Sequence, residues 1–324
     1  MLTSNRALAR QLETISCGYS ASIGSTIYPS GAWNEDDFIG INWRIRMNLR
    51  NILVLLDASP ASEERLKLAR EIAGSHGASL SAVFLRNQHI ADCPRLSKVP
   101  ERLSKQHGTL TDTTRLNGVA VDVIERRSRD AIEPLGGDWY SLDRITVSEL
   151  VAITQATDLV VAGQFPPDVE STNWRPEDLV VACGRPVLVI PYIGCAGSIG
   201  RRVLIAWNGS REATRALNDA LPIMSAAEVV TLVTIRPHRQ DLARDRPVIG
   251  RIVRHLARHG IIAQIDETFG DGPVSDILLS KSADAAVDLI VAGAYHRSRL
   301  RESVFGGTSH GLFQSMTVPV FMSH

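Results

Sequence analysis

The sequence predicts an α/β protein made of two doubly wound parallel-sheet domains. Continuous apolar runs, such as residues 52–56 and 289–292, suit strands that helices cover on both faces. Amphipathic helical patterns alternate with these runs along the chain. One unit is also written twice, because DLVVAG at 158–163 returns as DLIVAG at 288–293. A repeat of this length predicts two similar domains and excludes a solenoid of short repeats.

The repeat sets the expected domain boundaries. Residues 47–192 are expected to form the first domain and residues 200–324 the second, with the glycine-containing segment 193–199 as a short linker. Residues 1–46 are polar and rich in Ser and Gly. Two interpretations of them stay open: a disordered N-terminal extension, or sequence upstream of a true start at Met47.

In the first domain, a helix is expected directly after the first strand. Ser59 is a favourable N-cap, and Pro60 suits the first helical position. The apolar face of this helix is predicted at Leu66, Ala69, Ile72 and Ala73. Residues 87–137 show no pattern that assigns them, so this stretch is interpreted only as an insertion-bearing region.

In the second domain, the corresponding helix should be capped by Ser210, and Pro222 should end or kink it. A further amphipathic helix around 249–256 should stop at Gly260. Pro186 and Pro319 begin the last strand of each domain, which fits an early or edge position because proline has no amide proton to donate.

The composition limits the classes of function. Of the 324 residues, 44% are apolar and 22% are charged, which is typical of a globular protein. Basic and acidic residues both number 35, so no nucleic-acid partner is expected, although local basic patches stay open. No apolar run approaches the length of a membrane span, so no membrane partner is expected either. The scattered cysteines predict neither a disulfide framework nor a zinc site, which fits the cytoplasm. These are Cys17, Cys93, Cys183 and Cys195.

The most informative loop follows the fourth strand of the second domain, at residues 293–310. In an open parallel sheet, ligands bind beyond the carboxyl ends of the strands. The loop leads into a final helix through Gly306, Gly307, Thr308 and Ser309. Amides at that helix start and the two hydroxyls would suit a phosphate. Further positive charge comes from Arg297, Arg299 and Arg301. The alternative is an ordinary surface loop with solvated arginines.

These features together resemble the universal stress protein family in its tandem form. The resemblance rests on the strand end at 57–59, the repeated DLIVAG string at 288–293 and the glycine loop before Val-Pro-Val at 318–320. It covers the chain from residue 47 onward. It implies two domains of the adenine nucleotide alpha hydrolase-like fold.

The resemblance also implies ATP, with Mg²⁺, as a ligand of the second domain. ATP-binding members carry Gly-x2-Gly-x9-Gly-(Ser/Thr) in this loop. Gly293 and Gly306 match the first and third glycines, whereas His296 stands at the second and Gly307 at the Ser/Thr position. The hydroxyls that follow are those of Thr308 and Ser309. An imidazole still donates hydrogen bonds to phosphate, so these departures leave binding open.

The adenosine side of the site is assigned by the same resemblance. Asn208 replaces the acid that ends the first strand in many family members, and the end of the second strand near Val233 would face the adenosine. The first domain keeps Asp57, but residues 164–170 hold acids and prolines where the phosphate cradle would be. The candidate nucleotide-binding residues are therefore Asn208, Val233, Gly293, His296, Gly306, Gly307, Thr308 and Ser309.

The function expected on this basis is a cytoplasmic stress-response protein that binds an adenine nucleotide as a regulatory ligand. No base that would activate water is evident, so at most slow ATP hydrolysis is expected, without catalytic or metal-binding residues. The alternative is an interaction module with two degenerate pockets. In that case the last strand at 318–322 would offer an edge for a homodimer. On either interpretation the two domains are expected to pair within the chain.

Three further patterns are set aside. Residues 307–311 fit Gly-x-Ser-x-Gly, but no strand directly precedes them and no acid follows, as a hydrolase would require. His255 and His259 have helical metal-binding spacing, yet arginines flank them, which favours a solvated basic face. Trp139 and Tyr140 are expected to pack against helices and not to stack on a ligand.

Overall fold

The structure of the chain is a computed structural model that describes residues 48–86, 115–116, 119–143, 145–165, 175–195, 197–236, 239–294 and 307–324. All of them belong to one compact unit, Arg46–His324. Residues 47–192 are called the first half below, and residues 200–324 the second half.

The first half alternates strands and helices. Its elements are β1 (Asn51–Asp57), α2 (Pro60–His76), β2 (Ser79–Leu85), α6 (Val121–Ile132), the 3-10 turn η2 (Glu133–Leu135), β5 (Gly136–Leu142), α7 (Val147–Thr154), β6 (Leu159–Gly163), α8 (Pro176–Ala182) and β7 (Val187–Ile190). Two short strands, β3 (Arg115–Leu116) and β4 (Val119–Ala120), pair antiparallel in a small separate sheet.

The second half follows the same order. Its elements are β8 (Arg202–Ala206), α9 (Arg211–Asp219), α10 (Leu221–Met224), β9 (Val229–Arg236), α11 (Arg239–Arg258), β10 (Ala263–Phe269), α12 (Val274–Asp284), β11 (Leu289–Gly293), α13 (Gly307–Ser315) and β12 (Val320–Ser323). The strands predicted from continuous apolar runs are confirmed, since β6 and β11 are both buried throughout except at their terminal glycine.

Ten strands form one sheet, in the order β10-β9-β8-β11-β12-β7-β6-β1-β2-β5. Within each half the order is 3-2-1-4-5 and the pairing is parallel, as expected of a doubly wound fold. The halves meet where β7 and β12 pair antiparallel, with Leu188 opposite Phe321. The edge of the last strand, predicted as a homodimer route, is therefore occupied within the chain.

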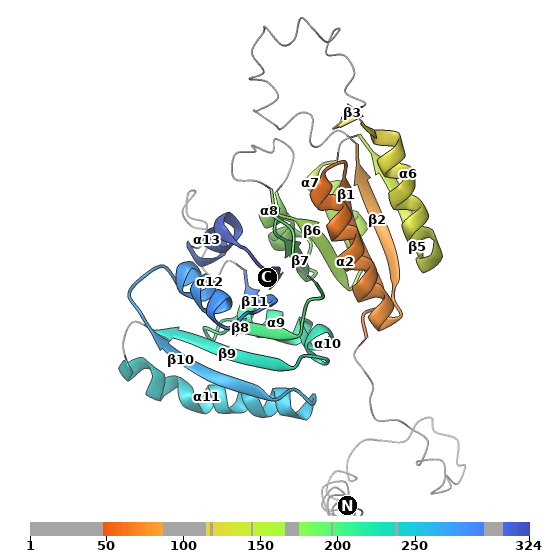
Figure 1. Cartoon of the computed structure of the whole chain (residues 1–324). Helices are drawn as coiled ribbons and strands as arrows, with labels where there is room; N and C mark the ends of the chain where they lie inside the picture. Colours follow the sequence, from red (N-terminus) through yellow and green to blue (C-terminus); the bar gives the residue numbers. More distant parts are fainter. Residues whose placement is uncertain are drawn as a thin grey trace, which may run out of the picture. The chain divides into compact units, whose positions relative to one another are not determined.

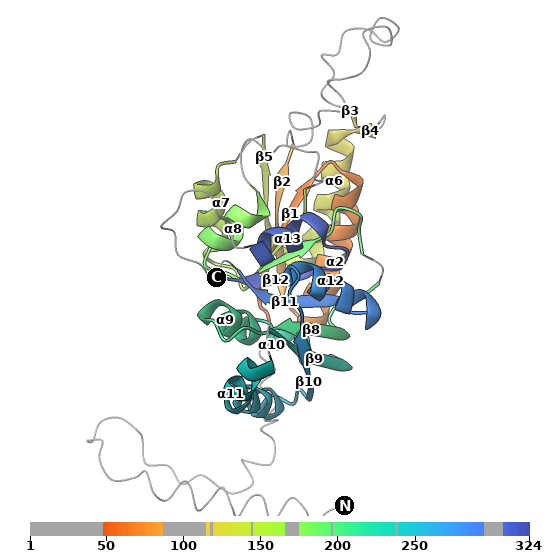
Figure 2. The ribbon, with the colours of Figure 1, turned by 90° about the vertical axis from the view of Figure 1, so that its left-hand side faces the viewer.

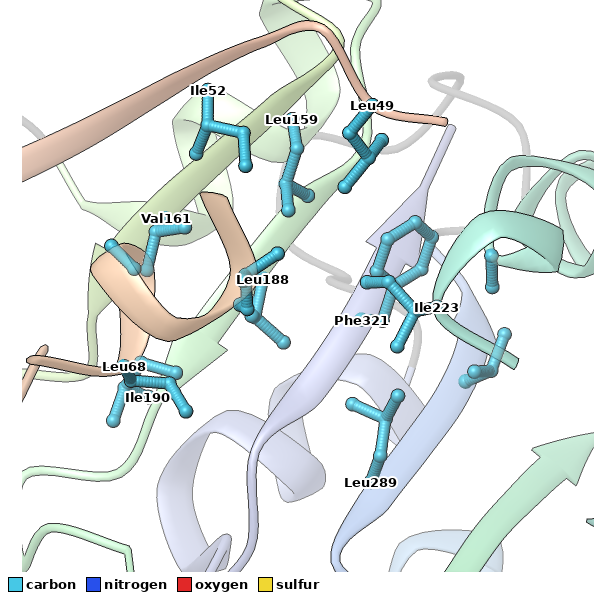
Figure 3. Close-up of a cluster of buried hydrophobic side chains, with 14 of the residues drawn as sticks. Leu49, Ile52, Leu68, Leu159, Val161, Leu188, Ile190, Ile223, Leu289 and Phe321 are labelled. Carbon is cyan, nitrogen blue, oxygen red and sulfur yellow. The ribbon is translucent and has the colours of Figure 1, made fainter. Parts of the chain in front are cut away.

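Helices cover both faces of this sheet, and each face carries its own apolar core (Figures 1 and 2). One face is covered by α2, α6, α9, α10 and α11. The other is covered by α7, α8, α12 and α13. The first core runs across the join, because Leu188 of β7 and Phe321 of β12 lie in one cluster with Ile52 and Leu289 (Figure 3). Burial of this continuous apolar surface holds the two halves together.

The strand register and helix starts relate residues of the two halves one to one. Five pairs matter for the site: Asp57 and Asn208, Arg65 and Ala216, Arg86 and Arg236, Gly163 and Gly293, and Gln164 and Ala294. Because the backbone is the same at each pair, differences in chemistry come from the side chains.

The predicted helix ends hold, with one correction. The Oγ of Ser210 accepts a hydrogen bond from the amide of Ala213, 3.0 Å away, which confirms it as the N-cap of α9. Helix α11 ends at Arg258, and Gly260 follows with φ +79°, as predicted. Ser59 stands at the N-cap position of α2, but its side chain accepts no capping bond. The amide of Ser59 instead donates to Asp57, 2.7 Å away.

The unassigned stretch 87–137 contains elements that the sequence did not reveal. Helix α6 lies within it, and β5 begins at its end and supplies the third strand of the first half. The burial of β5 alternates, unlike the continuous burial of its neighbours, because β5 lies at the sheet edge. Trp139 of β5 stacks on Phe84 of the neighbouring strand β2, with ring centroids 5.9 Å apart, and lies against the apolar core. Its partner in this stack is a strand residue and not a helix, and Tyr140 is exposed, so the predicted packing against helices is wrong for Tyr140.

The repeated aspartates have a structural role. The carboxylate of Asp158 accepts bonds from the amides of Arg50 and Asn51, at 2.7 and 3.0 Å. Asp288 does the same for the amides of Arg201 and Arg202, at 3.0 and 3.1 Å. In each half the first residue of the repeated string therefore ties the fourth strand to the start of the first. This explains its presence in both copies without a ligand.

Candidate functional site

The candidate site lies at the carboxyl ends of β8 and β11, where the strand order of the second half reverses direction. Three of the predicted residues come close to this edge of the sheet. Asn208 follows β8, Gly293 ends β11, and Gly307 begins α13. His296 and Gly306 lie outside the described residues, as do the loop arginines Arg297, Arg299 and Arg301.

Asn208 is exposed and shapes the turn between β8 and α9. Its Oδ1 accepts a hydrogen bond from the amide of Ser210, 2.9 Å away. Asp57 makes the same bond to the amide of Ser59 in the first half. An asparagine therefore preserves the turn and still carries an amide group that can donate to a ligand, without the negative charge.

Gly293 is required for helix packing. A Cβ added to it would lie 2.4 Å from the backbone nitrogen of Ala213 and 2.5 Å from the carbonyl carbon of Glu212. The start of α9 thus passes directly over the end of β11, at a distance that only glycine permits. This packing role is independent of the phosphate contact that the sequence pattern suggested.

The start of α13 presents two of the predicted residues to solvent. Gly307 is exposed and Thr308 is half-buried, whereas Ser309 is only 4% exposed. Helix α13 packs tightly on α12, since a Cβ added to Gly311 would meet Oγ of Ser275 at 2.3 Å. Accessible contacts at this helix start are therefore the first amides and the Thr308 hydroxyl. Burial of Ser309 inside a helix also agrees with setting aside a hydrolase elbow.

Val233 contributes little beyond its position. Its side chain is buried, and its carbonyl accepts the amide of Trp207 at 2.8 Å. Two other residues of β9, Thr234 and Arg236, were not predicted from the sequence. The guanidinium of Arg236 reaches back to the carbonyl oxygen of Asn208, 3.4 Å away. Thr234 is fully buried, and its Oγ1 has no hydrogen-bond partner among the described residues.

The first half fills the equivalent space with its own cation. Arg65 of α2 donates to Asp57 at 2.9 Å, and both side chains are almost fully buried. Nη1 of Arg65 lies over Gly163, only 1.7 Å from where a Cβ would stand. In the second half the position of Arg65 is taken by Ala216. In the first half Arg65 therefore neutralises the charge of Asp57 and also fills the space over Gly163.

The ends of β2 and β9 also differ in what their terminal arginine contacts. Arg86, which follows β2, forms ion pairs with Asp122 and Glu125 of α6 and with Asp143. The hydrogen bond to Asp122 is the largest cause that raises the pKa of Arg86. Its equivalent is Arg236, whose guanidinium donates to main-chain carbonyls at the end of β8 and β9.

The histidine pair on α11 packs ring to ring. The rings of His255 and His259 meet edge to face, and Nε2 of His255 lies 3.0 Å from Oδ1 of Asn218. Burial, followed by the charges of His259 and Arg258, lowers the pKa of His255. Among the described residues, no three His, Cys, Asp or Glu side chains are arranged to hold a metal ion. Nor does any helix in the described ranges combine the length and apolar character needed to cross a bilayer.

No protein-family model and no curated protein matches the chain. Solved structures do. A universal stress protein from Archaeoglobus fulgidus DSM 4304 aligns with 84% of this chain and 97% of its own, at 15% identity and a TM-score of 0.59. A protein assigned as a universal stress protein from Pseudomonas aeruginosa UCBPP-PA14 aligns over 85% and 93%, at 17% identity and a TM-score of 0.51. The chain therefore has the fold of the universal stress proteins.

Proposed function

We propose that this chain is a tandem universal stress protein of the cytoplasm whose second half binds an adenine nucleotide as a regulatory ligand. The fold supports this proposal, since its carboxyl edge is where doubly wound sheets bind nucleotides. The observation that carries it is the difference between the two crevices. Arg65 occupies the first over Gly163, whereas the second has Ala216 at that position.

The proposed ligand places its phosphates at the start of α13. The first amides of α13 and the Thr308 hydroxyl would donate to phosphate oxygens, aided by the helix dipole. Arg236 adds a positive charge at the neighbouring strand end, close to Asn208. Asn208 would bond the ribose or the base. When Mg²⁺ accompanies ATP it would be held mainly by the phosphates. The proposal assigns no catalytic residue.

Thermal unfolding with and without Mg·ATP tests the proposal. A ligand at a hundredfold excess over its dissociation constant stabilises the folded state by about 2.7 kcal/mol. We expect a rise in melting temperature with Mg·ATP, and titration calorimetry with ATP and AMP then measures how much the terminal phosphates contribute.

A matched pair of variants locates the site. Arg236→Ala should weaken nucleotide binding about tenfold, the effect of losing one charge-assisted hydrogen bond, whereas Arg86→Ala at the equivalent position should not. Gly307→Asp should have a larger effect and abolish binding, because it places a carboxylate next to the phosphates. That variant should still fold, since an acid at a helix start is favourable. Absence of any shift at millimolar ATP, or equal losses for both arginine variants, would contradict the proposal.

A further inference from the structure

The outer face of α11 is strongly basic. Residues 246–262 contain four arginines and two histidines, and no Asp or Glu. Arg251, Arg254 and Arg258 recur at spacings of three and four, which places them on one helix face, and all three are exposed. Within the described part of the chain, none of the three forms an ion pair. The neutral net charge of the whole chain therefore conceals a segregated basic surface.

This face cannot turn inward, because the opposite face of α11 is part of the core. Ile249 and Leu256 are buried against the sheet, at helical spacing with Ile252 and Val253. Figure 1 shows α11 running along β9 and β10, at the end of the sheet where β10 has no further partner strand. The arginines therefore project from a rigid platform.

Exposed aliphatic side chains flank the arginines. Ile262, just beyond the end of α11, is 86% exposed, and Val248 on the helix is also exposed. Ile265 of β10 is 49% exposed. It lies on the α11 side of the sheet, since Glu267, two residues along the same strand, bonds Arg246 of that helix. Positive charge and exposed aliphatic side chains therefore occur together at this end of the sheet.

We propose that this surface docks on a bilayer that contains anionic phospholipids. It consists of Val248, Arg251, Arg254, Arg258 and Ile262, and is called the α11 surface below. Arginines would pair with headgroup phosphates, and the aliphatic side chains would enter the boundary of the acyl region. A nucleic acid would also match the arginines, but it rewards aromatic stacking and gains little from burying aliphatic side chains. The expectation of no membrane partner rested on the lack of a membrane-spanning run, and peripheral docking needs no such run.

The equivalent helix of the first half offers an internal control. Helix α6 also has exposed arginines, Arg126, Arg127 and Arg129. Acids are interspersed with them, at Asp122, Glu125 and Asp130. Its net charge is therefore close to zero, and it should not hold the protein on an anionic surface.

Vesicle co-sedimentation of the full chain tests the proposal. We expect binding to phosphatidylglycerol–phosphatidylcholine vesicles at low salt, and none to phosphatidylcholine alone. Binding should disappear at about 1 M salt, where charges are screened within about 3 Å. Each arginine near an anionic surface contributes about fivefold in partition coefficient. The triple variant Arg251→Ala, Arg254→Ala and Arg258→Ala should therefore bind about a hundredfold less. Ile262→Ser should lose about tenfold.

The control triple variant Arg126→Ala, Arg127→Ala and Arg129→Ala should bind like the wild type. Equal losses in both triple variants would overturn the proposal, because binding would then reflect diffuse charge. Absence of binding to the anionic vesicles would also overturn it. So would tighter retention on duplex DNA at the same salt with no effect of Ile262→Ser, which would assign the surface to nucleic acid instead. All these variants are at exposed positions and should remain folded, which circular dichroism would check.

Discussion

The two halves share a backbone and differ in how charge is handled at the carboxyl ends of their strands. In the first half each cation there meets an acid: Arg65 pairs with Asp57, and Arg86 pairs with acids of α6. In the second half Ala216 replaces Arg65, and Arg236 reaches a main-chain carbonyl beside Asn208. In the first half a buried arginine of the same chain fills the space over Gly163. In the second half a small residue, Ala216, stands at the position of that arginine. Duplication thus preserved the scaffold while the side chains diverged.

The largest expected effect comes from breaking the internal ion pair of the first half. Arg65→Ala should lower the free energy of unfolding by about 3–5 kcal/mol, because it leaves Asp57 buried without its partner. Arg201→Ala, which removes an exposed pair with Glu228, should cost at most about 1 kcal/mol. Urea denaturation measures both. If Arg65→Ala lowered the free energy of unfolding no more than Arg201→Ala does, water would already hydrate the Asp57 carboxylate, and Arg65 would not fill the crevice.

The next largest effect is expected at Gly293, where α9 crosses the end of β11. Gly293→Ala should destabilise the protein by about 3 kcal/mol, since the new methyl group would meet the backbone of α9. Gly74→Ala in α2 meets nothing within 4 Å and should stabilise by about 0.5–1 kcal/mol. Thermal denaturation of the two variants provides the measurement. If Gly293→Ala were neutral in stability, the close approach of α9 would be wrong.

A smaller effect is expected at the join between the halves. The side chain of Gln164 donates to the carbonyl of Phe313 at 2.6 Å and accepts the amide of Tyr192 at 3.1 Å. The equivalent residue, Ala294, has no such side chain. Gln164→Ala removes a buried bond to the Phe313 carbonyl and a part-buried bond from the Tyr192 amide, and should cost about 2 kcal/mol. Gln264→Ala, on an exposed position, should change stability by less than about 0.5 kcal/mol. Similar values for both variants in chemical denaturation would show that water replaces these bonds.

The smallest effect concerns pH. Burial raises the pKa of Glu177 in α8 above its ordinary value of 4.5, so the folded state holds its proton more tightly than the unfolded state. Stability contributed by this group is therefore lost as pH rises from 4.5 through the raised pKa. Glu177→Gln should raise the melting temperature slightly at pH 7, and this gain should vanish near pH 4. A gain that is the same at both pH values would contradict the assignment.

The sequence predicted most of the parallel core and the location of the candidate site. Continuous apolar runs identify β1 and β11 because both faces of these strands are covered. Strand β5 was missed because an edge strand is only half buried, and its Gly-Gly-Asp start carries no strand signal. Pairing of the two domains within the chain was expected, but the particular pairing of β7 with β12 was not. Each looks like an ordinary terminal strand, and only tertiary contact decides what covers its edge.

The chemistry of the site was harder to predict than its position. Arg65 stands on a helical face among apolar residues, so its sequence context does not show that it plugs the crevice. Gly293 was assigned to a phosphate contact, whereas its neighbours in the structure are main-chain atoms of α9. A glycine marks the close approach of some group, and the sequence does not state which group approaches, so the packing role of Gly293 was not predicted and its phosphate contact stays a prediction.

The antiparallel ladder between β7 and β12 has a consequence for dilution. Two separate chains that met through these strands would obey mass action and come apart at low concentration. Here β7, which ends at Ile190, and β12, which begins at Val320, belong to the same chain, so their effective concentration stays high however dilute the sample. The melting temperature should accordingly be independent of protein concentration.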